Sequence, residues 1–223
     1  MTAREGWVAG FVPSLAGFQF ANRWPPGPLW RWRAALPGPL PIALQLTLGD
    51  VGGGLCGGMV LATRDYWEAG VAPPPDREPP PDGSAVRRLL VRRQLDSLAL
   101  GRTAIAFQRL AVAGPKARTA ATVRAAWPRI RAEIDAGHPA VVGLLRSTSV
   151  DPRRLVANHQ VLAYGYTLDG AAGTLDIAVY DPNHPADDAV RVRLTLTPDR
   201  RRLTIVHEPD GTGLAGLVAL PYG

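Results

Sequence analysis

The sequence predicts an α+β fold, with helices in the first part of the chain and an antiparallel sheet in the second. Apolar residues recur every three or four positions along 55–67, 84–100 and 127–137, which is the period of one buried helix face. From residue 140 onward, short apolar or alternating runs are bounded by glycine, proline and aspartate, a pattern typical of strands. Because the helices precede the strands instead of alternating with them, a parallel α/β fold is disfavoured.

The composition indicates an ordinary soluble globular domain. The chain has 223 residues, of which 46% are hydrophobic and 20% charged, enough to bury a core without disulfides. One cysteine excludes an intrachain disulfide and cysteine-rich zinc sites. We see no signal peptide and no run of about 20 apolar residues. A cytoplasmic location without a membrane span is therefore the default expectation, and export by another route stays open.

The net charge of +6 comes almost entirely from arginine. The arginines form short clusters on different predicted elements, and no nucleic-acid-binding motif accompanies them. We interpret them as solvated faces, so that nucleic acid is an unlikely partner.

Residues 1–48 combine many aromatic residues with repeated prolines. The prolines oppose long helices, whereas the aromatics indicate burial. We interpret 1–48 as an extended arm packed on a domain that spans 49–223. The arm either forms one wall of a cleft or simply covers the core.

Cys56 lies where a glycine-rich turn meets a predicted helix from Leu55 to about Trp67. The glycines at 52–54 permit a sharp entry into that helix. Unpaired N–H groups and the helix dipole at a helix N-terminus favour a thiolate, the nucleophilic form of cysteine. The alternative is a small, buried and inert residue.

Further elements follow in order. A proline-rich loop covers 71–83, Ser84 caps a helix that runs to about Leu100, and 103–118 is ambiguous. A third helix starts at Trp127 and ends at Gly137. The predicted strands are 140–145, 160–168, 175–180, 190–196, 203–206 and 217–220.

His159 opens the second of these strands and is the candidate partner of the cysteine. A hairpin turn centred on Gly170 pairs residues whose numbers sum to 340, which sets His159 opposite Asp181. A carboxylate there can hold the imidazole in one tautomer, and Asn183 is the alternative orienting residue. The other three histidines lack metal-ligand spacing, so we expect no metal and no cofactor.

Cys56, His159 with the run Asn-His-Gln-Val-Leu-Ala-Tyr-Gly-Tyr, and Asp181-Pro182 resemble the papain-like cysteine peptidase superfamily, in particular its bacterial C39-like branch. The resemblance covers roughly 49–182. It implies a papain-like fold, in which the nucleophile helix of an N-terminal helical half packs on the C-terminal sheet. The superfamily commonly carries an oxyanion-binding glutamine six residues before the cysteine, where this chain has Asp50. An ionised carboxylate donates no hydrogen bond. Either the Cys56 N–H works with another donor, Gln45 or Asn22, or Asp50 is held protonated.

The sequence thus predicts a cysteine-dependent hydrolase or acyltransferase of the peptidase or amidase type, with a Cys56–His159–Asp181 triad. Its partner would be a peptide, amide or acyl substrate. The alternative is a catalytically inactive papain-like fold that acts as a binding or interaction module, which Asp50 favours.

Overall fold

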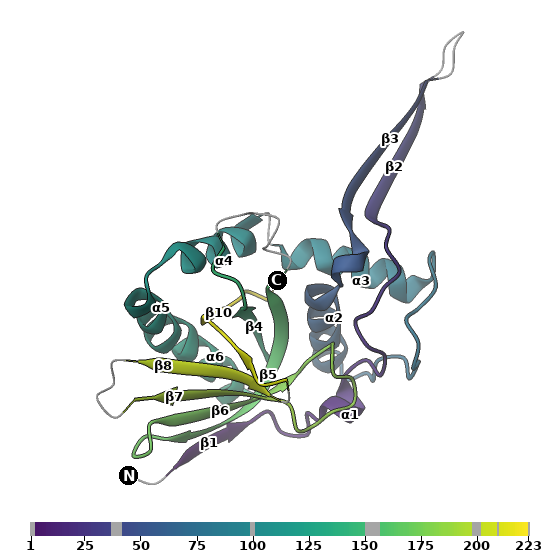
Figure 1. Cartoon of the computed structure of the whole chain (residues 1–223). Helices are drawn as coiled ribbons and strands as arrows, with labels where there is room; N and C mark the ends of the chain where they lie inside the picture. Colours follow the sequence, from purple (N-terminus) through teal and green to yellow (C-terminus); the bar gives the residue numbers. More distant parts are fainter. Residues whose placement is uncertain are drawn as a thin grey trace.

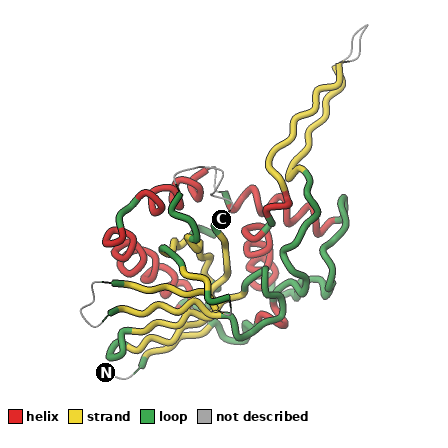
Figure 2. The backbone as a smooth tube through the Cα atoms, viewed as in Figure 1, coloured by secondary structure: helices red, strands yellow, loops and turns green. Residues whose placement is uncertain are grey.

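The computed structural model describes residues 3–36, 42–98, 101–149, 157–197, 202–208 and 210–222. For 28–36 and 42–51 it describes the backbone alone. The architecture combines helices with one curled antiparallel sheet and a projecting two-stranded ribbon (Figures 1 and 2). The predicted α+β class is confirmed at this level.

The helices occupy mainly the stretch between residues 56 and 135. They are α1 (Pro13–Ala16), α2 (Cys56–Glu68), α3 (Ala85–Ser97), α4 (Arg102–Val112), α5 (Pro115–Ala121) and α6 (Trp127–Asp135). A 3₁₀ turn, η1 (Val51–Gly53), precedes α2, and a π-helical turn, η3 (Thr122–Ala126), joins α5 to α6. The predicted helices α2, α3 and α6 are present, and the ambiguous stretch forms α4 and α5. None of the described helices is both long and apolar enough to cross a bilayer.

The strands follow the helices, apart from three near the N-terminus. They are β1 (Arg4–Trp7), β2 (Pro28–Leu36), β3 (Ile42–Asp50), β4 (Ala140–Leu145), β5 (His159–Asp169), β6 (Thr174–Tyr180), β7 (Arg191–Leu196), β8 (Leu203–Glu208), β9 (Thr212–Gly213) and β10 (Gly216–Ala219). The main sheet has the order β10-β4-β5-β6-β7-β8-β9, and β1 pairs with β5. All six strands expected from the sequence are present, with no end shifted by more than two residues.

The N-terminal segment 3–27 belongs to the body of the domain. β1 adds to the sheet beside the second half of β5. The aromatic residues that follow it are buried: Phe11 packs edge-on against Trp67, and Phe18, Phe20 and Trp24 join a cluster with α2. The predicted packing of an arm therefore describes 3–27. It does not describe β2 and β3, which pair with each other and extend away from the body (Figure 1).

The helices form two groups around the sheet. The group α4, α5 and α6 contacts β4 and β10, whereas α2 contacts β5 and packs against α3. The contact between α2 and α3 depends on glycine. A Cβ atom at Gly57 would overlap the Ser97 side chain, and one at Gly58 would overlap the backbone carbonyl of Leu90. Two small residues thus let α3 approach the first turn of α2.

The β5–β6 hairpin has a different register from the predicted one. Asp169 pairs with Thr174 and Gly165 with Ala178, so the residue numbers sum to 343 instead of 340. A bulge at Tyr164 then shifts the register, and Ala163 pairs with Val179, a sum of 342. The prediction that His159 lies directly opposite Asp181 is wrong, because the turn is centred between Ala171 and Ala172 instead of on Gly170, and the bulge was not foreseen.

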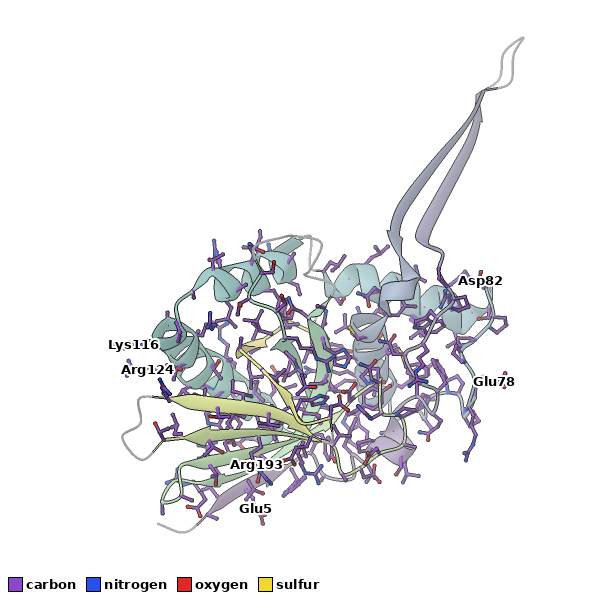
Figure 3. The ribbon with its side chains drawn as sticks, viewed as in Figure 1. Glu5, Glu78, Asp82, Lys116, Arg124 and Arg193 are labelled. Atoms are coloured by element: carbon purple, nitrogen blue, oxygen red, sulfur yellow. The ribbon has the colours of Figure 1, made fainter. Side chains whose placement is uncertain are left out.

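Arginines lie on separate elements, such as Arg124 in η3 and Arg193 in β7 (Figure 3). Several are ion-paired within the fold: Arg193 contacts Asp176 at 2.7 Å, and Arg64 contacts Glu133 at 2.8 Å. Part of the positive charge is therefore locally compensated.

Candidate active site

Cys56 is the first residue of α2 and is partly accessible. The turn before it contains Gly54, whose φ of +94° is a conformation that glycine adopts readily. Asn22 caps the helix from outside, since its Oδ1 accepts a hydrogen bond of 2.6 Å from the backbone N–H of Leu55. Gln94 on α3 accepts the N–H of Gly58 at 2.9 Å. The start of α2 is thereby fixed by two side chains from other parts of the chain.

The structure brings together the three residues predicted to form the triad. The imidazole of His159 lies close enough to the thiol of Cys56 for each group to shift the pKa of the other. The other side of the ring faces Asp181, with 2.6 Å between His159 Nε2 and Asp181 Oδ1. His159 is 4% exposed and Asp181 is fully buried, so water does not weaken this contact.

The bulge at Tyr164 explains why Asp181 reaches His159 despite the wrong register. On the His159 side of the bulge, Leu162 pairs with Tyr180. Continuing this register by one residue sets Asp181 opposite Val161. Val161 and His159 are two residues apart and share a face of β5. Without the bulge the numbers of paired residues would still sum to 343, so Asp181 would lie opposite Leu162. The Leu162 side chain is on the face of β5 opposite to that of His159. One extra residue in β5 therefore sets the carboxylate on the imidazole side.

Tyr164 also marks a change of partner strand. β4 pairs with β5 between His159 and Ala163, and β1 takes over from Gly165. The N–H of Val8 donates to the carbonyl of Tyr164 at 2.8 Å, which satisfies the bulged residue. β1 therefore stabilises the irregularity that orients the site.

The charges within the site shift the pKa values of its members. Burial disfavours the Cys56 thiolate, but the hydrogen bond and charge of His159 outweigh it and lower the thiol pKa, assisted by the N–H groups of Gln160 and Gly57. Burial likewise opposes the His159 imidazolium, yet Asp181 and then Cys56 raise its pKa to about 9. The pKa of Asp181 is held well below its usual range, because His159, His207 and the Asn183 N–H outweigh its burial. These directions favour a thiolate–imidazolium pair at neutral pH.

Asp181 has further partners that sequence reasoning missed. The N–H of Asn183 donates to Oδ1 at 2.8 Å, and His207 Nε2 lies 3.0 Å from Oδ2. His207 is fully buried at the end of β8. The sequence showed only a histidine ending a strand, and no spacing signal linked it to a residue 26 positions earlier.

The network continues from His207 towards the surface. His184 Nε2 lies 3.0 Å from Asp210 Oδ1, and the rings of His184 and His207 are 6.1 Å apart. Arg146 Nη2 lies 3.4 Å from His207 Nδ1. Within the described ranges, no three His, Cys, Asp or Glu side chains are arranged to hold one metal ion.

The remaining predicted residues have different positions. Asn183 turns its side chain to Asn22, whose Nδ2 donates to Asn183 Oδ1 at 3.2 Å, so it supports the carboxylate through its backbone. Asn22 lies beside the start of α2, as expected for an oxyanion donor. Gln45 and Asp50 are in β3, where they pair with Arg33 and Pro28, and their side chains lie outside the described part of the structure.

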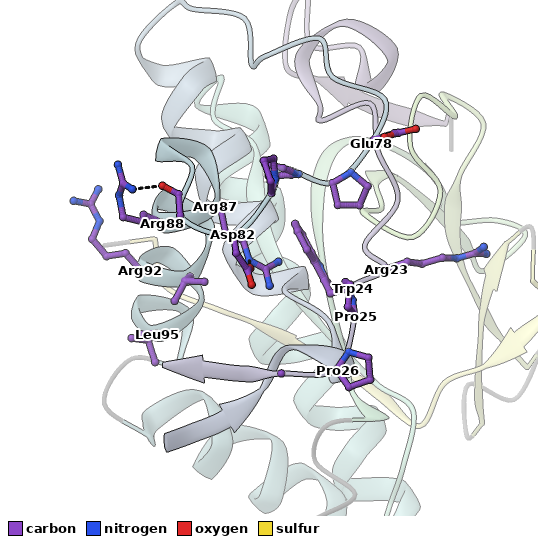
Figure 4. A pocket seen from close by; sticks show the side chains of 16 residues that line it. Arg23, Trp24, Pro25, Pro26, Glu78, Asp82, Arg87, Arg88, Arg92 and Leu95 are labelled. Carbon is purple, nitrogen blue, oxygen red and sulfur yellow. Dashed lines mark hydrogen bonds and ion pairs between the residues drawn. The ribbon is translucent and has the colours of Figure 1, made fainter. Parts of the chain in front are cut away.

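A groove of about 1220 Å³ runs along α3 next to this region (Figure 4). Its wall includes Trp24, whose indole N–H donates to Asn22 Oδ1 at 2.8 Å, and Arg87, which stacks on the Trp24 ring at 4.1 Å. The other lining residues come from the stretches 23–27, 78–83 and 88–95. Cys56 does not line the groove, but Asn22 connects the two.

Comparisons of the chain with protein-family models, curated proteins and solved structures give no match. The interpretation of the site therefore depends on its own geometry.

Proposed function

We propose that the protein is a cysteine-dependent hydrolase or acyltransferase of the peptidase or amidase type, with the papain-like arrangement that its sequence resembles. The observation that carries this proposal is the chain of contacts from the Cys56 thiol through His159 to the buried carboxylate of Asp181. A thiol paired with an imidazole in this way is activated for attack on a carbonyl carbon.

In the proposed reaction Cys56 is the nucleophile, and His159 acts first as an acid and then as a base. The Cys56 thiolate attacks the carbonyl carbon, and the carbonyl electrons move to oxygen. The imidazolium of His159 gives its proton to the leaving nitrogen, and the C–N bond breaks to leave a thioester on Cys56. Neutral His159 then takes a proton from water, or from an acceptor amine, which attacks the thioester and releases the thiolate. Asp181 stays ionised and orients the ring.

The negative oxygen of the intermediate requires hydrogen-bond donors. The N–H of Cys56, at the N-terminal end of α2, supplies one. We assign the second to Asn22 Nδ2, which has two hydrogens and uses one for Asn183. Each such donor is worth on the order of 10²–10³ in rate. The groove along Trp24 offers room for a part of the substrate remote from the bond that breaks.

The test is the pH dependence of Cys56 alkylation by iodoacetamide. The paired thiolate should react well below pH 7, and His159→Ala should slow this reaction sharply. His138→Ala is the matched control, because His138 is an exposed histidine that contacts Glu68 on the far part of α2. A profile with a midpoint near ~8.5, that of an ordinary thiol, would refute the activated pair.

A non-catalytic interaction module is the second candidate, and the projecting β2–β3 ribbon favours it (Figure 1). Such a module would keep its function in a Cys56→Ala variant, whereas a hydrolase would lose turnover completely.

A further inference from the structure

The second oxygen of the Asp181 carboxylate has a partner that the proposed reaction does not use. We propose that His207 is a positioning residue of the site: its Nε2–H holds Asp181 Oδ2, so that Oδ1 stays directed at His159. This inference rests on the proposed function and deepens it, since it concerns how the carboxylate of that same triad is held in its orientation.

The contact is isolated from water and from competing groups. Asp181 and His207 are both fully buried, and Asp181 Oδ2 lies 3.0 Å from His207 Nε2. Neither atom has a hydrogen bond of good geometry among the described residues, so this 3.0 Å contact, whose alignment is imperfect, is the polar interaction that each makes. Leaving a buried carboxylate oxygen without any donor is costly, so His207 is the group that compensates Oδ2.

The surroundings of His207 determine which ring nitrogen carries the proton. Arg146 Nη2 lies 3.4 Å from Nδ1, and a guanidinium donates but never accepts. Nδ1 therefore accepts, which leaves the hydrogen of the neutral ring on Nε2, facing Asp181. Asp210 Oδ2 is 3.6 Å from Nδ1, beyond hydrogen-bond distance, and His184 faces the ring at 6.1 Å between centroids. These groups are the charged and titratable neighbours of His207.

Positioning is needed because a carboxylate turns about its Cβ–Cγ bond. On the Oδ1 side Asp181 meets His159 and the N–H of Asn183. A donor on the opposite oxygen, supplied by another strand, fixes the plane of the group. If Oδ2 lost this donor, the carboxylate would rotate away from His159, and the imidazolium would lose part of its stabilisation.

The test is a titration of the His159 ring by NMR in the full-length protein, with the variants His207→Leu and His207→Gln. In His207→Leu the pKa of His159 should fall by on the order of one unit, which corresponds to a weakened charge-assisted hydrogen bond. His207→Gln provides an amide donor and should restore most of the value. His184→Gln is the matched control, because His184 contacts Asp210 and not the Asp181 carboxylate.

Two results would overturn the inference. An unchanged or higher His159 pKa in His207→Leu would mean that His207 does not position the carboxylate. If that variant fails to fold, the ¹⁵N chemical shifts of the His207 ring in the native protein show which nitrogen carries the proton. A proton on Nδ1 instead of Nε2 contradicts the proposal. Neither readout needs turnover. If the His159 pKa falls in His207→Leu but Cys56 is alkylated with the pH profile of an ordinary thiol, His207 positions the carboxylate and the proposed hydrolase function is wrong.

Discussion

Replacing Cys56 by serine should make the free energy of unfolding fall with rising pH. In the variant, the proton held by His159 in the folded state is no longer matched by a thiol proton in the unfolded state. Serine keeps a hydroxyl of similar size and does not ionise in this range. If the proposed thiolate–imidazolium pair forms, the wild-type folded site binds one proton, shared between thiol and imidazole. Between pH 6.5 and about 8.5 the unfolded chain also binds one, on the thiol. The two states then bind equal numbers of protons, and this site adds no slope.

The variant differs because the unfolded chain has lost that thiol proton. Its folded state keeps the His159 proton, since Asp181, the larger of the two favourable influences on the imidazolium, remains. A folded-state pKa raised above the unfolded value stabilises the protein fully below pH 6.5, and this stability is lost as the pH rises through the folded pKa. The slope is at most about 1.4 kcal/mol per pH unit for one proton, so the variant should lose about 2 kcal/mol relative to wild type between pH 6.5 and 8.5.

Urea unfolding of both proteins at pH 6.5, 7.5 and 8.5 measures this difference, and titrations elsewhere in the chain cancel. A gap between wild type and variant that stays constant with pH would show that His159 is not protonated in the folded variant above pH 6.5. The assumption that Asp181 dominates its pKa would then be wrong.

Two substitutions test how the start of α2 is held. Gly58→Ala should lower the free energy of unfolding by about 1–3 kcal/mol, because the new methyl group meets the carbonyl of Leu90; Gly114→Ala, where a Cβ meets nothing within 4 Å, is the control, and equal urea midpoints would exclude the steric explanation. Asn22→Ala should cost about 1–2 kcal/mol by removing the acceptor of the Leu55 N–H, and should also slow turnover. A variant with wild-type rates would remove Asn22 from the oxyanion site.

Local patterns predicted α2, α3, α6 and most of the later strands, whereas α1 was missed and the stretch of α4 and α5 was ambiguous. Periodicity and caps are local properties: Ser84 accepts the N–H of Arg87 as a helix cap, as expected from its place in the sequence. β1 was missed because Arg4–Trp7 is short, largely exposed and stabilised by a strand 160 residues away. Its partner could not be inferred from its own composition.

The site shows the same division between local and distant information. Cys56, His159 and Asp181 were found because each has a distinctive local setting, whereas the link between the last two was derived from a wrong register. The bulge at Tyr164 depends on the exchange of β4 for β1, a tertiary event with no local signature. His207 stayed hidden for a similar reason, since a strand-end histidine looks alike whether or not a carboxylate lies behind it.

The course of the first 27 residues limits how the domain can be divided. A fragment that starts at residue 49 would lack the strand beside β5 and also Asn22, which caps Leu55. Removal of this segment would therefore take away contacts of the bulge and of the start of α2 together. A fragment that keeps the described fold therefore has to include the N-terminal segment.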